Sequence, residues 1–305
     1  MSWLSYEARD WLRQQRTGIV IIAVATVFAT AAIYYSFYIA GGQGVYVDKH
    51  LCLLDGSIPG HHVVLLDGTD QFDLTQQEIV QRVIHNEAAL VRPFEKLTIA
   101  AVDQDRPYSP HVLFSGCAPK NSGDANRWSE NPDIIGSIWN NRFMKPALVP
   151  LRVMAAAPGQ RRTPLVESVF GMTLWPDFSS SVRHRHLVIV SDMLQNTSLY
   201  SHYGGKRGPS FADFAGRPGA LQNIPDLTGV TVVGYYLIRT ATMSLQSDAQ
   251  KQFWIDYFGA AQTSVRFEGW PWHALQSLRG AAAHQAPPLP VHRHHHRRRP
   301  LLKFP

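Results

Sequence analysis

The sequence lacks the short motifs that mark several common enzyme families. It contains no GxSxG turn, which positions the nucleophile of many serine hydrolases, and no GxxxxGK[ST] loop, which surrounds nucleotide phosphates. No GxGxxG sequence follows the first expected strand either. These absences argue against the enzyme classes that depend on such motifs.

Charged residues are few, at 17% of the chain, whereas 45% of the residues are hydrophobic. A chain of 305 residues with this composition is long enough for one sizeable folded domain and too apolar to be mostly disordered. Of the formal net charge of +6, five units come from the segment 291–305. The rest of the chain is nearly neutral, which argues against a basic nucleic-acid groove. We expect the Pro/His/Arg-rich segment 276–305 to be a disordered tail.

The segment 18–40 contains no charged residue and is long enough to cross a bilayer as a helix. Arginines precede it at positions 9, 13 and 16, whereas Lys49 is the only Lys or Arg that follows it closely. The positive-inside rule therefore predicts that residues 1–17 are cytoplasmic and that the main domain lies outside. In a bacterium this is a single-pass protein of the inner (cytoplasmic) membrane with a periplasmic domain. A cleaved signal peptide is the alternative.

Cysteine occurs only twice, as Cys52 and Cys117. The two residues have neither the spacing of a zinc site nor that of a CxxC redox pair. Both follow the apolar segment, on the side that we expect to be outside the cytoplasm, where a disulfide is chemically allowed. The sequence leaves two alternatives open, a disulfide between them or two buried thiols.

Between a linker at 41–60 and the tail, strand-like apolar runs alternate with amphipathic helical stretches. The expected strands are 62–66, 97–102, 111–115, 185–192, 230–239 and 264–270. The expected helices are 75–90, 134–157, one with Thr163 as its N-cap, and one with Ser247 as its N-cap. The turn between the second and third strands is short enough to predict an antiparallel edge pair. The pattern predicts an α/β fold over residues 61–275, a Rossmann-like three-layer sandwich with a mostly parallel six-stranded sheet.

Polar residues close two of these strands. Asp67, Thr69 and Asp70 follow the first strand, and Asp192 ends the fourth. In an open parallel sheet, ligands bind at the carboxyl ends of strands where the strand order reverses. These side chains either hold a divalent cation together or are ordinary turn and capping residues.

This strand order, with acidic residues closing the first and fourth strands, resembles the von Willebrand factor A-type (vWA) domain. The signature of that family is Asp-x-Ser-x-Ser after the first strand, a Thr in a later loop and an Asp after the fourth strand. Asp67 and Thr69 match the first two positions, Thr163 is the candidate for the Thr, and Asp192 matches the later Asp. Gln71 stands where the family has its second Ser. The resemblance covers about residues 60–270, and the chain is also similar to bacterial membrane-anchored proteins of this type without an assigned activity.

The resemblance implies a metal ion-dependent adhesion site made by Asp67, Thr69, Gln71, Thr163 and Asp192. Carboxylate, hydroxyl and amide oxygens are hard ligands that suit Mg²⁺, or else Mn²⁺ or Ca²⁺. An open coordination position on such a cation accepts a carboxylate from a partner protein. The departure at Gln71 leaves the site degenerate, because an amide is a longer and neutral ligand.

Two long polar loops, 117–133 and 192–211, leave the sheet near this site, and loops of this length are usually functional or disordered. We expect Asp70, Asn196 and Tyr200 to form a partner-binding rim there. The histidines near the strand starts, including His62 and His186, are interpreted as strand-edge or surface residues.

Three functions compete. The first is a membrane-anchored, vWA-like module that binds a protein partner through a divalent cation, as part of an envelope assembly. The second is a metal-dependent phosphoesterase that uses Asp67, because "LLDGTD" resembles the haloacid dehalogenase motif with its second acid one place late. The third is a metal-free scaffold of a membrane complex. We favour the first, non-enzymatic function.

Overall fold

The computed structural model of the chain describes residue 11 and residues 15–35, 47–126, 130–155, 159–203 and 208–268. The expected tail at 276–305 lies outside these residues, as do Arg9, Arg13 and positions 36–40 of the expected membrane span. Helix α2 (Arg16–Tyr34) is the one helix in the described part that is long and apolar enough to cross a membrane. None of the residues of α2 is buried against the rest of the protein. It begins two residues before the expected span and, at 19 residues, is about 28 Å long.

Six strands form one sheet. They are β1 (Gly60–Leu66), β2 (Lys96–Ala101), β3 (His111–Cys117), β4 (His184–Ser191), β5 (Val230–Tyr236) and β6 (Val265–Glu268). The order across the sheet is β3-β2-β1-β4-β5-β6, and β3 is antiparallel to β2 whereas all other neighbours are parallel. The predicted α/β class, the mostly parallel sheet and the antiparallel edge pair are therefore confirmed.

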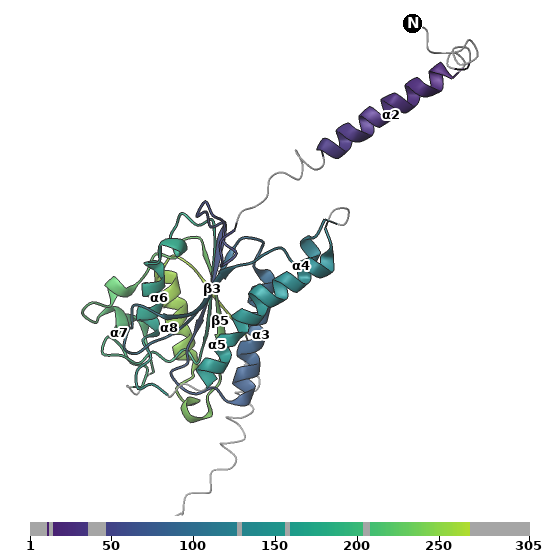
Figure 1. The fold of residues 1–305 in the computed structure, drawn as a ribbon. Coiled ribbons are helices and arrows are strands. Elements are labelled where there is room, and N and C mark those ends of the chain that lie inside the picture. The colour runs from purple at the N-terminus through teal and green to yellow at the C-terminus, as the bar shows by residue number, and fades with distance from the viewer. Residues whose placement is uncertain are drawn as a thin grey trace, which may run out of the picture.

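Helices cover both faces of the sheet (Figure 1). On β1, Val63 and Leu65 point to the core shared with α6 (Leu165–Thr173) and α8 (Asp248–Ala260). Val64 and Leu66 point to the opposite core, shared with α3 (Leu74–Leu90) and α5 (Lys145–Ala155). All four side chains are fully buried. The unbroken apolar run of β1 thus follows from its central position, because a strand covered on both faces has no solvent side.

The remaining helical segments connect these layers. They include α4 (Pro132–Trp139) and α7 (Phe211–Ala215), the latter beside α8. The single helix expected at 134–157 is interrupted, because a five-residue π-helical segment at 140–144 separates α4 from α5. The Ser247 cap predicted for α8 is confirmed, since its side chain accepts a hydrogen bond from the backbone of Gln250.

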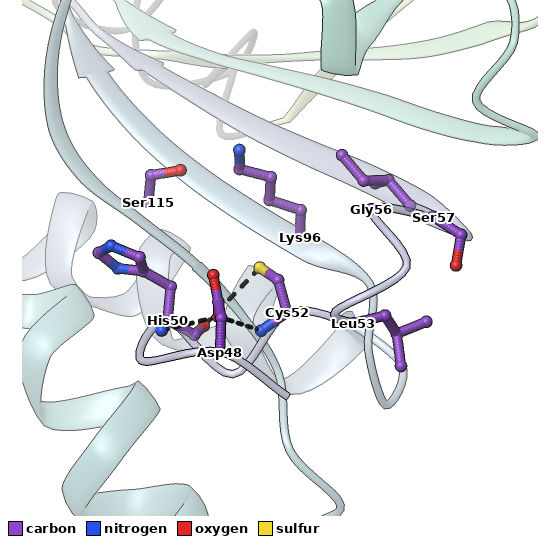
Figure 2. A pocket seen from close by; sticks show the side chains of 9 residues that line it. Asp48, His50, Cys52, Leu53, Gly56, Ser57, Lys96 and Ser115 are labelled. Atoms are coloured by element: carbon purple, nitrogen blue, oxygen red, sulfur yellow. Dashed lines mark hydrogen bonds between the residues drawn. The ribbon is translucent and has the colours of Figure 1, made fainter. Parts of the chain in front are cut away.

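A disulfide joins Cys52, in the segment before β1, to Cys117 at the end of β3. The turn around Cys52 is held by Asp48, whose Oδ1 accepts the backbone N–H groups of His50 and Cys52 at 2.8 and 2.9 Å. Figure 2 shows this segment lying along the strands, with Lys96 and Ser115 lining the same pocket. The segment that follows the apolar helix is therefore fixed covalently to the edge of the sheet.

Candidate functional site

The carboxyl ends of β1 and β4 lie next to each other at the centre of the sheet. Leu66 and Val190 are register partners, and the backbone N–H of Asp67 donates to the carbonyl of Val190 at 2.9 Å. The chain goes from β1 to β2 on one side, whereas β4 lies on the other side, so the strand order reverses here. This is the position where open α/β sheets bind their ligands, and it brings Asp67 close to Asp192.

The carboxylate of Asp67 is fully buried and hydrogen-bonded on both oxygens. Its Oδ1 accepts from the backbone N–H and the hydroxyl of Thr69, at 3.2 and 2.7 Å. Its Oδ2 accepts from the hydroxyl of Ser191, the last residue of β4, at 2.6 Å. Asp67 therefore orients two hydroxyl groups from the two central strand ends.

Thr163 reaches this cluster from the loop before α6. Its hydroxyl donates to Thr69 Oγ1 at 3.0 Å, and its side chain is buried. The prediction that Thr163 caps α6 is wrong: the helix begins at Leu165 after Pro164, and no side chain caps it. The backbone of Thr163 pairs with Asn196 in both directions, which holds the residue extended and directs its hydroxyl to Thr69.

Asp192 carries the second buried carboxylate. Its Oδ1 accepts the backbone N–H of Leu194 at 3.0 Å, and its Oδ2 lies 3.0 Å from Arg239 Nε. Burial, followed by the negative charge of Asp67, raises the pKa of Asp192 to about 7. The two carboxylates therefore repel each other in a poorly hydrated place.

Arg239 is a site residue that the sequence interpretation missed. The expected fifth strand ended at this residue, whereas β5 ends at Tyr236 and the following segment brings the guanidinium back over the site. Its side chain is 8% exposed and donates to the backbone carbonyls of Asp67 and Gln71 at 3.4 and 3.5 Å. Its Nε also lies 3.7 Å from Asp70 Oδ2. The sequence signal that could have identified Arg239 is its position just beyond a buried strand, at the same edge of the sheet as two acidic residues.

The predicted ligand Gln71 is exposed, and its backbone carbonyl is bonded to Arg239. Asp70 lies at the mouth of the site with a side chain that is 53% exposed. Asn196 is half-buried, with its amide group bonded to the carbonyl of Arg161 and the hydroxyl of Ser201. Of the expected rim, Asp70 is thus exposed beside the carboxylates, and Asn196 holds the loop together.

Tyr200, which we expect from the sequence in the partner-binding rim, is buried in the structure. Tyr200 is 7% exposed and stacks on Phe253 of α8, with ring centroids 5.4 Å apart. Its hydroxyl donates a hydrogen bond to the carbonyl of Ser210 and accepts one from the backbone N–H of the same residue. The ring therefore belongs to the hydrophobic core beneath the loop that follows β4. The aromatic residue at the mouth is Tyr203, which is 46% exposed. Burial, followed by the charges of Asp192 and Asp70, raises the pKa of Tyr203 to about 12.

The donors gathered here suit a hard cation. Two threonine hydroxyls and two carboxylates from three separate segments converge, and Asp70 adds a third carboxylate at the mouth. Among the described residues, Arg239 is the only basic side chain that forms an ion pair with any of these acids. Three carboxylates against one guanidinium favour the binding of additional positive charge. Oxygen-only ligands are those that Mg²⁺ and Ca²⁺ prefer.

No protein-family model matches the sequence, and a comparison with curated proteins finds no match. Similar solved structures include a von Willebrand factor type A protein from Catenulispora acidiphila, at 12% identity and a TM-score of 0.39. The alignment covers 74% of this chain and 42%, less than half, of that one. The conserved hypothetical protein BatB from Bacteroides thetaiotaomicron aligns over 75% of this chain and 98% of its own, at 9% identity and a TM-score of 0.35.

An aerotolerance-related membrane protein from Bacteroides fragilis aligns over 73% of this chain and 98% of its own, at 9% identity and a TM-score of 0.33. At such identities and TM-scores these similarities assign no function, which has to be inferred from the side chains of the site. The chain has an α/β fold with a mostly parallel six-stranded sheet, and its N-terminal helix α2 is long and apolar enough to cross a membrane.

Proposed function

We propose that this chain is a membrane-anchored, vWA-like module that binds a protein partner through a divalent cation at the carboxyl ends of β1 and β4. We expect the cation to be Mg²⁺, with Mn²⁺ or Ca²⁺ as alternatives. In this proposal the domain faces the periplasm and belongs to an envelope assembly. The observation that carries the proposal is the buried cluster in which Thr163, Thr69 and Asp67 are linked by hydrogen bonds beside Asp192.

The hydrogen bonds suggest a role for each side chain. Both oxygens of Asp67 already accept hydrogen bonds, so this residue orients the hydroxyls of Thr69 and Ser191. The cation then takes oxygen ligands from Thr69, Thr163 and Asp192, with water and a carboxylate of the partner in the remaining positions. Gln71 has no part in this proposal, because its side chain is exposed.

The geometry gives no support to the phosphoesterase hypothesis. A nucleophilic carboxylate needs an oxygen that can approach the phosphorus atom. The Asp67 carboxylate is fully buried, and three hydrogen bonds occupy its oxygens.

The metal-free scaffold is a second candidate, and the ion pair between Arg239 and Asp192 favours it. A guanidinium 3.0 Å from the carboxylate supplies positive charge without any cation. In that case the partner recognises the exposed groups at the mouth, Asp70 and Tyr203, by surface contacts alone.

Titration of Mg²⁺ into the full chain in detergent, after treatment with a chelator, separates the two candidates. We expect one Mg²⁺ per chain and a rise in melting temperature, because a ligand at one hundred times its dissociation constant adds about 2.7 kcal/mol to native stability. Asp192→Asn and Thr163→Val should lose this response. The control is Asp105→Asn, whose side chain is 77% exposed, and it should respond as the wild type does. Equal melting with and without Mg²⁺ in all four proteins would contradict the cation site and leave the metal-free scaffold as the better candidate.

A further inference from the structure

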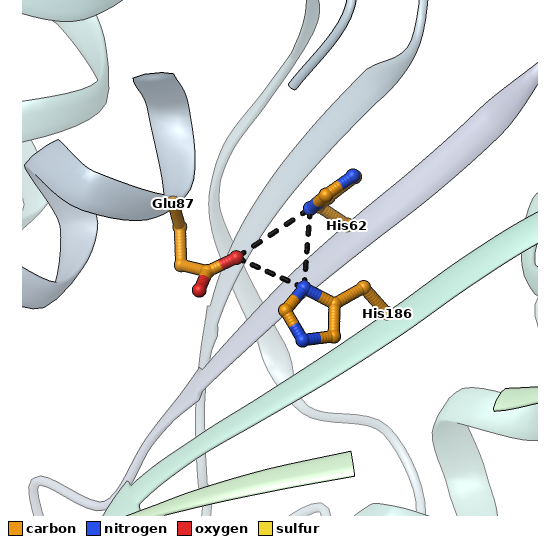
Figure 3. Close-up of side chains that lie close together, drawn as sticks. All are labelled: His62, Glu87 and His186. Atoms are coloured by element: carbon orange, nitrogen blue, oxygen red, sulfur yellow. Dashed lines mark hydrogen bonds and ion pairs between the residues drawn. The ribbon is translucent and has the colours of Figure 1, made fainter. Parts of the chain in front are cut away.

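A second polar cluster lies at the opposite edge of the sheet, near the amino ends of the strands. His62 on β1 and His186 on β4 are register partners, and they point to the face that α3 covers. Glu87, in the last turn of α3, extends its carboxylate to both imidazoles (Figure 3). The three side chains come from three different elements and meet at one point.

The spacing of the three nearest atoms is that of ligands around one metal ion. Glu87 Oε2 lies 3.1 Å from His186 Nδ1 and 3.4 Å from His62 Nδ1, and the two nitrogens are 3.3 Å apart. Ligands at about 2.0–2.1 Å from a tetrahedral Zn²⁺ are separated from one another by about 3.3 Å. The triangle therefore has the dimensions of one face of such a coordination sphere.

Hydrogen bonding alone accounts less well for this arrangement. If both imidazoles donate their Nδ1–H groups to Glu87 Oε2, the donor–acceptor distances of 3.1 and 3.4 Å are longer than the about 2.7–2.9 Å of charge-assisted bonds. Two N–H groups are then also crowded together, with their nitrogens 3.3 Å apart. A cation between the three atoms removes this conflict, because it accepts all three lone pairs.

The surroundings fit a ligand site with access to solvent. The Glu87 side chain is only 3% exposed, whereas those of His62 and His186 are 12% and 16% exposed. The carboxylate is therefore shielded from water, whereas the two imidazoles remain partly open to solvent.

A further carboxylate lies behind His62. The Nε2 atom of His62 lies 3.7 Å from Oε2 of Glu95. The Glu95 carboxylate in turn accepts hydrogen bonds from the backbone N–H and the Nε–H of Arg92, at 3.0 and 2.9 Å. Metal-binding histidines usually present their second ring nitrogen to such a carboxylate, which fixes the ring and makes it a stronger ligand.

We propose that His62, Glu87 and His186 bind a divalent transition-metal ion of the Zn²⁺ class, separate from the oxygen site at the other edge of the sheet. Two imidazoles and one carboxylate are ligands for Zn²⁺, whereas Mg²⁺ and Ca²⁺ prefer oxygen alone. Three protein ligands leave a fourth position for water or for a group from a partner. The bound ion ties the end of α3 to the two central strands.

The experiment has to exclude the tail, because its histidines at positions 292, 294, 295 and 296 are residues that can also bind transition metals. The parent protein is therefore the full chain in detergent with these four residues changed to Gln. After treatment with a chelator, Zn²⁺ is added and binding is measured by equilibrium dialysis and by thermal unfolding, in the presence of excess Mg²⁺. We expect one tightly bound Zn²⁺ per chain and a higher melting temperature. Co²⁺ should give the absorption spectrum of a tetrahedral nitrogen–oxygen site.

Matched variants locate the site. His62→Gln and His186→Gln should each bind Zn²⁺ at least tenfold more weakly and lose the Co²⁺ spectrum, and Glu95→Gln should weaken binding by about 10–100-fold. His111→Gln is the control, because this exposed residue at the start of β3 contacts Arg106 and lies outside the cluster, and it should bind as the parent does. The proposal is overturned if the parent binds no stoichiometric Zn²⁺, or if both His62→Gln and His186→Gln retain it. A parent whose melting depends on pH but not on Zn²⁺ would show that the cluster binds protons only, and this too overturns it.

Discussion

Arg239 Nε lies 3.0 Å from Asp192 Oδ2, and both side chains are less than 10% exposed, at 8% and 5%. A buried ion pair is costly to break, since the remaining charge loses its partner without regaining water. This pair therefore decides how the carboxylates behave in the absence of other cations.

Arg239→Gln should lower the free energy of unfolding by about 3–5 kcal/mol when no divalent cation is present. If Mg²⁺ binds beside Asp192, it should restore part of this stability and bind more tightly than to the wild type, because a competing positive charge is gone. Denaturant unfolding with and without Mg²⁺ measures both effects. Arg266→Gln is the control: that arginine also lies 3.0 Å from a carboxylate, but its side chain is 72% exposed, so the change should be within about 1 kcal/mol. If Arg239→Gln is destabilised and Mg²⁺ does not change its free energy of unfolding, the result favours the metal-free scaffold over the cation site.

Reduction of the disulfide should destabilise the domain without unfolding the sheet. The bond closes a loop with a sequence separation of 65 residues, and its loss should cost about 2–4 kcal/mol, mainly because the unfolded chain gains freedom. Melting of the wild type with and without dithiothreitol measures the effect. A variant with both Cys52→Ala and Cys117→Ala should melt near the reduced wild type and should not respond to the reductant. If dithiothreitol leaves the melting of the wild type unchanged, the cross-link contributes nothing to stability.

Acid should destabilise the domain through two buried histidines. Burial lowers the pKa of His202 to about 3 and that of His61 to about 4, from 6.5 in each case. Both are therefore neutral in the folded protein, and the unfolded chain binds more protons once the pH falls below 6.5. Unfolding free energy should fall by about 1.4 kcal/mol per pH unit for each histidine, between pH 6.5 and the folded pKa of that residue.

The test is the slope of stability against pH. His202→Leu should reduce this slope by one histidine, since His202 packs among Tyr200, Phe253 and Trp254 where an apolar side chain is accommodated. His85→Gln, on the exposed face of α3, should leave the slope unchanged. An unaltered slope in His202→Leu would mean that His202 is protonated in the folded state as well.

The pattern of apolar residues in the sequence was sufficient to predict the sheet and the acidic residues at the carboxyl ends of its central strands. The apolar runs at β1 and β4 are continuous because both strands are covered on two faces, and a strand end followed by Asp is visible in one dimension. The Ser247 cap could be recognised because capping depends on residues only three positions apart.

The missed residues depend on contacts between distant segments. Arg239 reaches Asp67 across 172 positions, through a loop whose course no local pattern predicts. His62 meets His186 across 124 positions, because the register of β1 against β4 sets them opposite each other. Thr163 was assigned to a cap from its neighbour Pro164, whereas its pairing with Asn196 determines where its hydroxyl points. Such relationships arise only when the sheet is assembled.

The orientation in the membrane can be tested without knowledge of the partner. A reporter enzyme that is active only outside the cytoplasm, fused after Pro305, should be active, because Arg9 and Arg13 precede helix α2 and Arg16 is its first residue. Changing Arg9, Arg13 and Arg16 to Gln should weaken or invert the orientation and lower reporter activity.

The matched control changes Arg297, Arg298 and Arg299 to Gln. These residues lie far beyond the 15–20 residues next to a span that determine orientation, so reporter activity should remain as in the unaltered fusion. An inactive wild-type fusion, together with activity of a reporter that needs the cytoplasm, would place the domain inside. The disulfide between Cys52 and Cys117 would then have to persist among reducing thiols, which disfavour such bonds. An external orientation of the domain and an intact disulfide are therefore expected together. Alkylation of free thiols in intact cells tests the disulfide without the reporter fusion.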